Sequence, residues 1–197
     1  ELNSKNWNPL HGTSKEGKEI SKLIGASLFE GNRANVLNLQ KQEGKKIIHI
    51  ASHAFFLENK EKKIEDLMLR SGIVFSGANY PENNPNDDGY LMALEITRLN
   101  WEDTEMVVIS ACESGRGQIL TGEGVYGLKR AISVAGAKSS LLSLWKVDDQ
   151  ATADFMVNFY KKLIAGQGRA EALTNTQRDF RNHKNKLYRH PYIWAAF

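Results

Sequence analysis

The sequence lacks several features that would place it in a specialised class of protein. It has a single cysteine, Cys112, which excludes an internal disulfide and a zinc site built from several thiolates. No apolar run approaches the roughly 20 residues that a membrane-spanning helix needs, and the polar start lacks the apolar stretch of a signal peptide. Neither charge dominates, because 26 Lys and Arg residues are scattered among 23 Asp and Glu residues. We therefore expect a cytoplasmic protein that binds neither membranes nor, directly, nucleic acid.

What the sequence does contain is an alternation of strand-like and helix-like segments over a length that suits one buried core. Apolar runs predict strands, and amphipathic segments with Gly or Asp at their ends predict helices. The predicted strands span 46–51, 66–75 (as one strand or two), 105–111, 139–145 and 191–197. The predicted helices span 13–31, 34–41, 92–99, 125–135, 148–166 and 169–183. This order predicts an α/β sandwich with a mostly parallel sheet. We expect a single domain over 1–197, and the missing Met and the apolar end predict a C-terminal fragment of a longer chain.

Two of the predicted strands run into reactive side chains, His53 and Cys112. Parallel strands expose their carboxyl ends at one edge of a sheet, so the two residues are expected to meet there. A free thiol is weakly ionised at neutral pH, and a neighbouring imidazole can take its proton. The segment Ser110-Ala-Cys-Glu-Ser-Gly115 partly matches the caspase signature, and His53 lies 59 positions upstream of Cys112. The pattern favours a cysteine nucleophile with a histidine base.

The chain resembles the CHAT family, whose members are caspase-like cysteine peptidases often attached to tetratricopeptide repeats in bacteria. The resemblance follows the segments PLHGTSKEGKEI, IIHIASHAFF, GYLMALEI, VVISACESGRGQ, GEGVYGLKRAISVAGAKSSLLSLWKVDD and HPYIWAAF in order. It implies a caspase–hemoglobinase-like fold with helices on both faces of the sheet. It also implies a catalytic dyad of His53 and Cys112, with the backbone N–H groups of Cys112 and Ala54 as the oxyanion hole. Ala54 departs from the family, which has glycine there, and its methyl group is expected to crowd the site.

The expected function is a cysteine endopeptidase that cleaves a protein substrate without a cofactor. We expect a tetratricopeptide-repeat region in the same chain, or an activating partner, to switch it on. Ser110, Asp148 and Asp149 are candidates for the substrate pocket, and an acid there would favour Lys or Arg in the substrate. The alternative is a catalytically silent regulatory or interaction module with the same fold.

Three other motifs have simpler interpretations. His49 and His53 lie four residues apart, but no third ligand is apparent and no metal is expected. The segment Asn84–Glu95 nearly matches a calcium loop, but a turn followed by a short helix explains it equally well. The segment Gly122–Gly127 matches G-x-G-x-x-G and would be the sole basis for a nucleotide-binding oxidoreductase, but a helix entry is the better interpretation.

Overall fold

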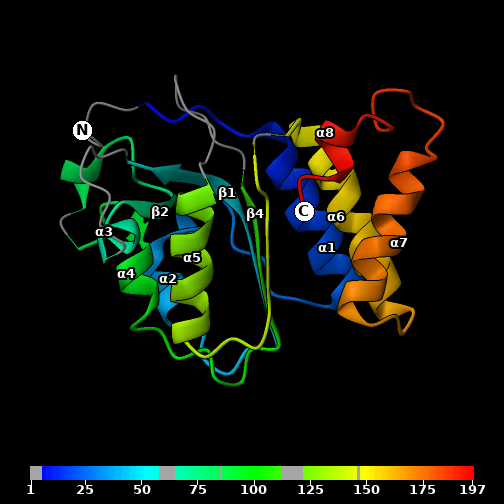
Figure 1. Ribbon diagram of the computed structural model, residues 1–197. Coiled ribbons are helices and arrows are strands. Elements are labelled where there is room, and N and C mark those ends of the chain that lie inside the picture. The colour runs from blue at the N-terminus through cyan, green and yellow to red at the C-terminus, as the bar shows by residue number, and fades with distance from the viewer. Residues whose placement is uncertain (1–5, 58–64, 85, 112–121, 146) are drawn as a thin grey trace. The chain divides into compact units, whose positions relative to one another are not determined.

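The computed structural model describes residues 6–57, 65–84, 86–111, 122–145 and 147–197 (Figure 1). The chain divides into two compact units. The first consists of Glu1–Asn8 and Phe29–Leu144, and the second of Pro9–Leu28 and Trp145–Phe197. That residues 1–197 act as a single domain stays a prediction. Within the described ranges, no helix is both long and apolar enough to cross a membrane.

The first unit holds all the described strands, and the second is helical. The elements of the first unit are η2 (Gly31–Arg33), α2 (Val36–Gln40), β1 (Ile47–Phe56), α3 (Glu65–Met68), β2 (Ser71–Val74), η3 (Pro81–Asn83), β3 (Tyr90–Met92), α4 (Ala93–Ile96), β4 (Met106–Ala111), α5 (Gly122–Val134) and β5 (Ser140–Leu142). Those of the second unit are α1 (His11–Ile24), α6 (Asp149–Ile164), α7 (Arg169–Arg181) and α8 (Pro191–Trp194).

The sheet has the strand order β3-β2-β1-β4-β5, and the prediction that it is mostly parallel was wrong. β4 pairs in parallel with β1 and β5, whereas β2 pairs antiparallel with β1 and β3. The buried apolar strands misled the prediction, because β2 is buried at all four positions although both of its neighbours are antiparallel. The α/β class is confirmed, but helices on both faces of the sheet stay a prediction.

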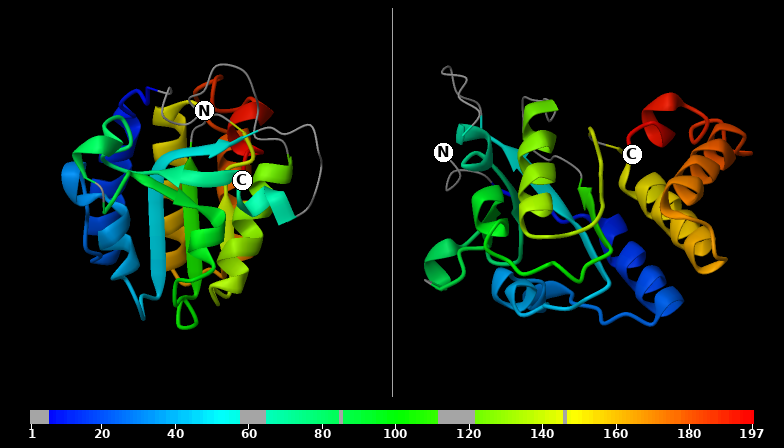
Figure 2. Two further views of the ribbon diagram at one scale, coloured as in Figure 1. Left: turned by 90° about the vertical axis from the view of Figure 1, so that its left-hand side faces the viewer. Right: turned by 60° about the horizontal axis from the view of Figure 1, so that its bottom comes forward.

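Strand β1 joins the parallel and antiparallel halves of the sheet. Its first part, Ile47–Ser52, pairs with β4, and its last part, His53–Phe56, pairs with β2. Figure 2 shows β1 and β4 running side by side. The change of partner at His53 places this residue beside the described end of β4, where Ser52 is opposite Ala111.

A hydrophobic core in the first unit joins β1, β2 and β4 to α2, α4 and α5. Gly127 lets α5 approach the sheet closely, because a Cβ at this position would lie 2.5 Å from Oγ of Ser71 and 3.0 Å from the Leu67 carbonyl oxygen. Helix α5 begins at Gly122, as the helix-entry interpretation of the G-x-G-x-x-G motif predicted. The third glycine of the motif, Gly127, therefore allows α5 to pack closely against β2 and α3.

In the second unit, α6 packs against α1 and α7. The predicted cap of α6 is confirmed, since the Asp148 carboxylate accepts a hydrogen bond from the Ala151 N–H at 2.9 Å. The predicted strand at 191–197 was wrong. Pro191 instead opens the short helix α8, and Nδ1 of His190 accepts a hydrogen bond from the Tyr192 N–H at 3.2 Å.

Helix α1 begins at His11, before the capping box predicted at 13–16. The Thr13 hydroxyl donates to the Leu10 carbonyl, and Gly25, in the left-handed conformation, ends the helix earlier than the predicted stop at Gly31.

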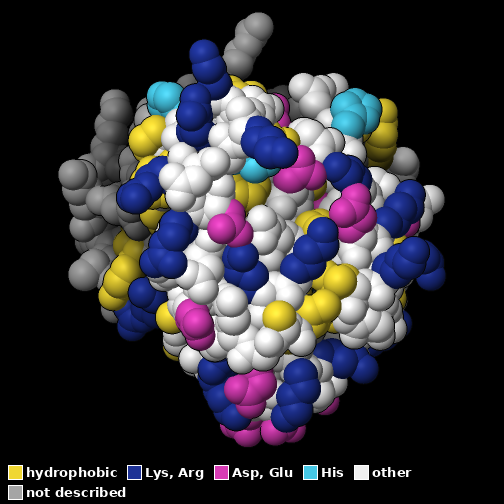
Figure 3. All heavy atoms as spheres, turned by 90° about the vertical axis from the view of Figure 1, so that its right-hand side faces the viewer, with side chains coloured by type: hydrophobic (Ala, Val, Ile, Leu, Met, Phe, Trp, Pro, Cys, Tyr) yellow, Lys and Arg dark blue, Asp and Glu magenta, His cyan; other side chains and the backbone are white. Residues whose placement is uncertain are grey.

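Figure 3 shows many Lys and Arg side chains on the face that carries α6 and α7. From Phe180 to the end of the chain there is no Asp or Glu residue.

Candidate active site

His53 lies in β1 opposite Val74 of β2, and only 5% of its surface is exposed. Its side chain shares a face of the strand with Phe55, because side chains two residues apart in a strand point the same way. The apolar cluster on this face contains Trp7, Phe55, Val74, Ala78 and Tyr90. The sheet therefore fixes the His53 backbone, and Trp7 of this cluster packs against its ring.

The Nε2 atom of His53 lies 2.7 Å from the carbonyl oxygen of Asn8. A carbonyl oxygen can only accept a hydrogen bond, so Nε2 must carry the hydrogen. In the neutral ring the lone pair is then on Nδ1, which is the nitrogen able to accept a proton. The Asn8 carbonyl thus selects the tautomer of His53 and would also stabilise the imidazolium after proton uptake.

Trp7 covers the His53 ring and is itself 6% exposed. The centroids of the two rings are 5.3 Å apart, and the Trp7 ring also lies 6.2 Å from Phe55 and 6.5 Å from Tyr90. The Trp7 Nε1–H donates to the Tyr90 hydroxyl at 3.0 Å, so its polar end is satisfied although the ring is buried. These contacts keep the segment before α1 against β1 and β3.

The second member of the predicted dyad, Cys112, lies outside the described residues. It follows Ala111, the last residue of β4, directly in the sequence. Ala54 is described, and its side chain packs in the core of the first unit, with 1% of its surface exposed. Since neighbouring side chains of a strand point to opposite faces, the Ala54 methyl group points away from the face that carries His53. That it crowds the site beside Cys112 stays a prediction.

The three residues predicted for the substrate pocket have structural surroundings of different kinds. Ser110 lies in β4 opposite Ala51, is 2% exposed, and its hydroxyl has no hydrogen-bond partner among the described residues. Asp148 and Asp149 belong to the second unit. Asp148 caps α6, and Asp149 accepts a hydrogen bond from the Gly12 N–H at 3.5 Å. Their role in a substrate pocket stays a prediction.

The Asn- and Asp-rich segment before β3 uses its side chains in turns. Asp87 accepts hydrogen bonds from the N–H groups of Gly89 and Leu37, and Asp88 accepts one from Tyr90. Glu95 accepts one from the Met92 N–H, which caps α4. These bonds fit the turn interpretation better than a calcium loop. In the described part of the chain, no cluster of His, Cys, Asp and Glu side chains is arranged to hold a metal ion.

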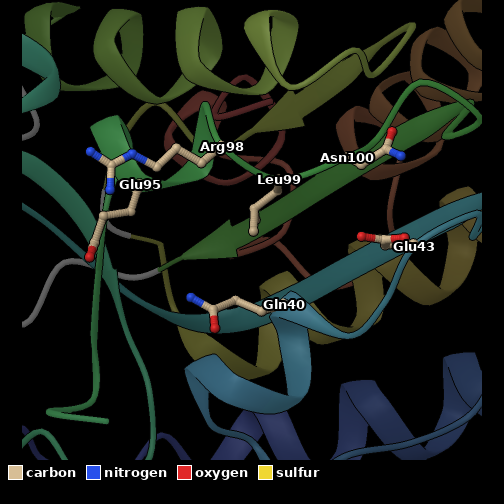
Figure 4. Close-up of a pocket in the computed structure, with 6 residues that line it drawn as sticks. All are labelled: Gln40, Glu43, Glu95, Arg98, Leu99 and Asn100. Atoms are coloured by element: carbon tan, nitrogen blue, oxygen red, sulfur yellow. The ribbon is translucent and has the colours of Figure 1, made fainter. Parts of the chain in front are cut away.

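One open pocket of about 270 Å³ lies elsewhere in the first unit (Figure 4). It is lined by side chains from α2, α4 and the segments that follow them, namely Gln40, Glu43, Glu95, Arg98, Leu99 and Asn100. None of these six was predicted for the site. The pocket contains no nucleophile, and its acidic and basic side chains do not form a recognisable catalytic arrangement.

Sequence reasoning missed the residues around His53. Trp7 and Asn8 contact its ring, and Asn79 is hydrogen-bonded to Trp7. Asn79 lies 72 positions after Trp7, and the two exchange hydrogen bonds. The only signal was a tryptophan in an otherwise polar segment outside any predicted helix or strand. No periodic pattern could have connected that tryptophan with a turn so far along the chain.

Comparison with known proteins identifies the family. The model of the CHAT domain matches residues 1–197. Tetratricopeptide repeat protein 28 of Mus musculus and that of Homo sapiens are each 25% identical to the chain over 219 residues. The match covers 97% of this chain but only 8% of either relative. Both relatives are mammalian, so they do not support the bacterial setting that the resemblance implied. With the family model matching the chain from end to end, the protein belongs to the CHAT domain family, whose members are caspase-like.

Proposed function

We propose that the chain is a cysteine endopeptidase in which Cys112 is the nucleophile and His53 the general base. The observation that carries the proposal is the 2.7 Å contact between Nε2 of His53 and the Asn8 carbonyl oxygen. With the hydrogen on Nε2, the lone pair of the neutral ring is on Nδ1. A base beside a thiol needs such a nitrogen to accept the thiol proton. The strand register supports the pairing, because Ser52 and Ala111 are opposite each other and the next residues are His53 and Cys112.

In the proposed reaction the thiol proton of Cys112 moves to Nδ1 of His53, and the thiolate attacks the scissile carbonyl carbon. The tetrahedral intermediate collapses as His53 returns the proton to the leaving amine, which breaks the peptide bond. Water, deprotonated by the same imidazole, then cleaves the thioester and regenerates the thiol. The Asn8 carbonyl helps at each protonated stage, because it accepts the Nε2–H of the imidazolium.

The backbone around Ala54 supports a role for its N–H in the oxyanion hole. The Leu57 N–H donates to the Arg70 carbonyl, and bonded pairs alternate along antiparallel strands. Phe55 and His53 are therefore the next residues that exchange backbone bonds with β2. The main chain of Ala54 faces the opposite neighbour, β4, whose described part ends at Ala111. An N–H directed there could bind a developing oxyanion beside Cys112.

The substrate is proposed to be a protein. Both relatives are tetratricopeptide repeat proteins, which supports a repeat region in the same chain, or an activating partner, as the switch. Ser110, Asp148 and Asp149 remain the proposed pocket residues, and an acidic pocket would select Lys or Arg. A set of peptides that differ only at that residue tests this, and equal cleavage of Asp and Arg peptides would refute it.

A second candidate function is a catalytically silent module that binds a partner. The burial of His53 favours it, because a ring with 5% exposure beneath Trp7 offers little surface to a substrate. The two functions predict different thiol chemistry. A working dyad makes the thiol reactive at pH values below those at which a free cysteine ionises. A silent module leaves the thiol with the reactivity of an isolated cysteine.

The test is the rate at which iodoacetamide alkylates the thiol as a function of pH. The chain has one cysteine, so every labelled thiol is Cys112. We expect a fast rate at pH 6 in the wild type, and a rate that falls at least about tenfold in His53→Ala. His49→Ala is the matched control, since His49 lies on the same strand. A rate that rises only above about pH 8 in all three proteins would refute the dyad.

A further inference from the structure

The acceptor of His53 lies in a segment without regular structure. Residues 6–10 belong to no helix or strand, so no ladder of backbone hydrogen bonds fixes the Asn8 carbonyl. A loose carbonyl would let the imidazole rotate or change tautomer, and a base that is misplaced by about 1 Å can lose a hundredfold in rate. Side chains must therefore hold this segment in place.

Asn79 holds the neighbouring residue, Trp7, with both ends of its carboxamide. The Trp7 N–H donates to Oδ1 of Asn79 at 2.8 Å, and Nδ2 of Asn79 donates to the Trp7 carbonyl at 3.0 Å. One side chain thus satisfies both backbone groups of Trp7, as an adjacent strand would. The next carbonyl along the chain is that of Asn8, which accepts the hydrogen bond from His53.

The turn that carries Asn79 is itself fixed against β3. The Phe75 N–H donates to the Gly89 carbonyl at 2.7 Å, and the Tyr90 hydroxyl donates to the Ala78 carbonyl at 3.1 Å. Gly89 has a φ of 78°, and a Cβ there would lie 2.2 Å from the Ala78 nitrogen. Only glycine permits this close approach of the two backbones. These contacts therefore fix the backbone of the turn that carries Asn79.

We infer that Asn79 is a positioning residue that acts on His53 through Trp7 and Asn8. It fixes the Trp7 peptide, which directs the Asn8 carbonyl at Nε2 of His53 and keeps the lone pair on Nδ1. The catalytic value of this arrangement rests on the proposed function. The effect on the imidazole tautomer does not, and it can be measured whether or not the protein cleaves peptides.

The test combines NMR with the thiol assay. The whole chain is labelled with ¹⁵N in its histidine rings, and the His53 signal is assigned by its loss in His53→Gln. At a pH where the ring is neutral, we expect the wild type to have hydrogen on Nε2 alone. In Asn79→Ala we expect a mixture of both tautomers, together with a fall of at least about tenfold in the alkylation rate. Asn83→Ala is the matched control, because Asn83 is exposed on the neighbouring turn η3.

A His53 tautomer that is unchanged in Asn79→Ala overturns the inference, whatever the thiol does. If the tautomer mixes but the wild-type thiol proves unactivated, the positioning role stands and the proposed peptidase function fails. If Asn79→Ala does not fold, Asn79→Asp takes its place. It keeps the acceptor for the Trp7 N–H and loses the donor to the Trp7 carbonyl, so a partial mixture supports the inference and a wild-type spectrum refutes it.

Discussion

The first unit is built around a sheet and the second around helices, and the two differ in charge as well. The first has 14 Lys and Arg residues against 16 Asp and Glu residues, a net charge of −2, and the second has 12 against 7, a net charge of +5. In the first unit the contacts at His53 join Trp7 and Asn8 to residues more than 40 positions away. In the second, α6, α7 and α8 follow one another along the chain, while α1 packs against α6 although Gly12 and Asp149, which are hydrogen-bonded, lie 137 positions apart. Both units therefore use distant pairings, but those of the first unit bring polar groups to His53, whereas those of the second pack one helix against another.

The largest expected effect is a loss of stability that is confined to the first unit. Trp7→Ala removes a ring that is 6% exposed and in contact with His53, Phe55 and Tyr90, so we expect a loss of about 3–5 kcal/mol in stability. Trp194→Ala, in the second unit, removes a half-buried ring and should cost less. Hydrogen exchange should show weaker protection in β1 and β3 after the first change. Equal loss in α6 and α7 would mean that the two units unfold together.

A smaller effect is expected from crowding the contact between α5 and the sheet. Gly127→Ser places a Cβ 2.5 Å from Oγ of Ser71, and we expect it to cost about 1–3 kcal/mol. The same change at Gly168, the N-cap of α7, meets nothing within 4 Å and supplies a good capping side chain. Urea unfolding of both variants tests the pair. A neutral Gly127→Ser would show that α5 can move away from β2.

Acid is expected to weaken the second unit through Asp154. Burial raises the pKa of Asp154, but hydrogen bonds from Tyr188, Lys15 and Gln150 outweigh it and hold that pKa below its usual value. A lowered pKa stabilises the fold above the unfolded-state value of about 3.9, and the stability is lost as the pH falls through the lowered value. Because the carboxylate is partly exposed, solvent screening limits the effect to about 1 kcal/mol. We expect the free energy of unfolding, measured with urea, to decrease less between pH 5 and pH 3 in Asp154→Asn than in the wild type. An equally steep decrease in both proteins would contradict this.

An effect of similar size concerns the cap of α6. Asp148→Ala loses the hydrogen bond to the Ala151 N–H and should cost about 1 kcal/mol, whereas Asp148→Asn keeps a capping oxygen and should cost little. The same two variants test the proposed pocket. If Asp148 selects basic substrates, both changes weaken the preference for Arg over Asp peptides. A preference that survives in Asp148→Asn would leave Asp148 a structural role only.

Local signals predicted much of this structure. Helix α6 follows from Asp148 and an apolar stripe, and β4 follows from a run that is buried on both faces. Segments with short apolar runs were ambiguous. The sequence PYIWAAF has strand-like composition, but His190 and Pro191 start a helix there. The direction of β2 also depended on tertiary pairing, which no local pattern encodes.

The same contrast applies to the site. His53 could be found because a strand pattern runs into it. Its acceptor could not, since a backbone carbonyl carries no sequence signature and Asn79 is one of several asparagines near the prolines of a loop. The physical link between them is visible only once β3 and the turn at Gly89 bring Asn79 beside Trp7.

The position of Asn8 has a practical consequence for anyone who trims the protein. Asn8 is the last residue of the first unit's leading segment, and α1 begins at His11. A boundary drawn just before α1, the first helix that the structure describes, could start the chain at Pro9. The shortened protein would keep every helix and strand that the structure describes but lack both Trp7 and the carbonyl that accepts from His53. Its inactivity would then reflect the cut, and would be no evidence against the dyad.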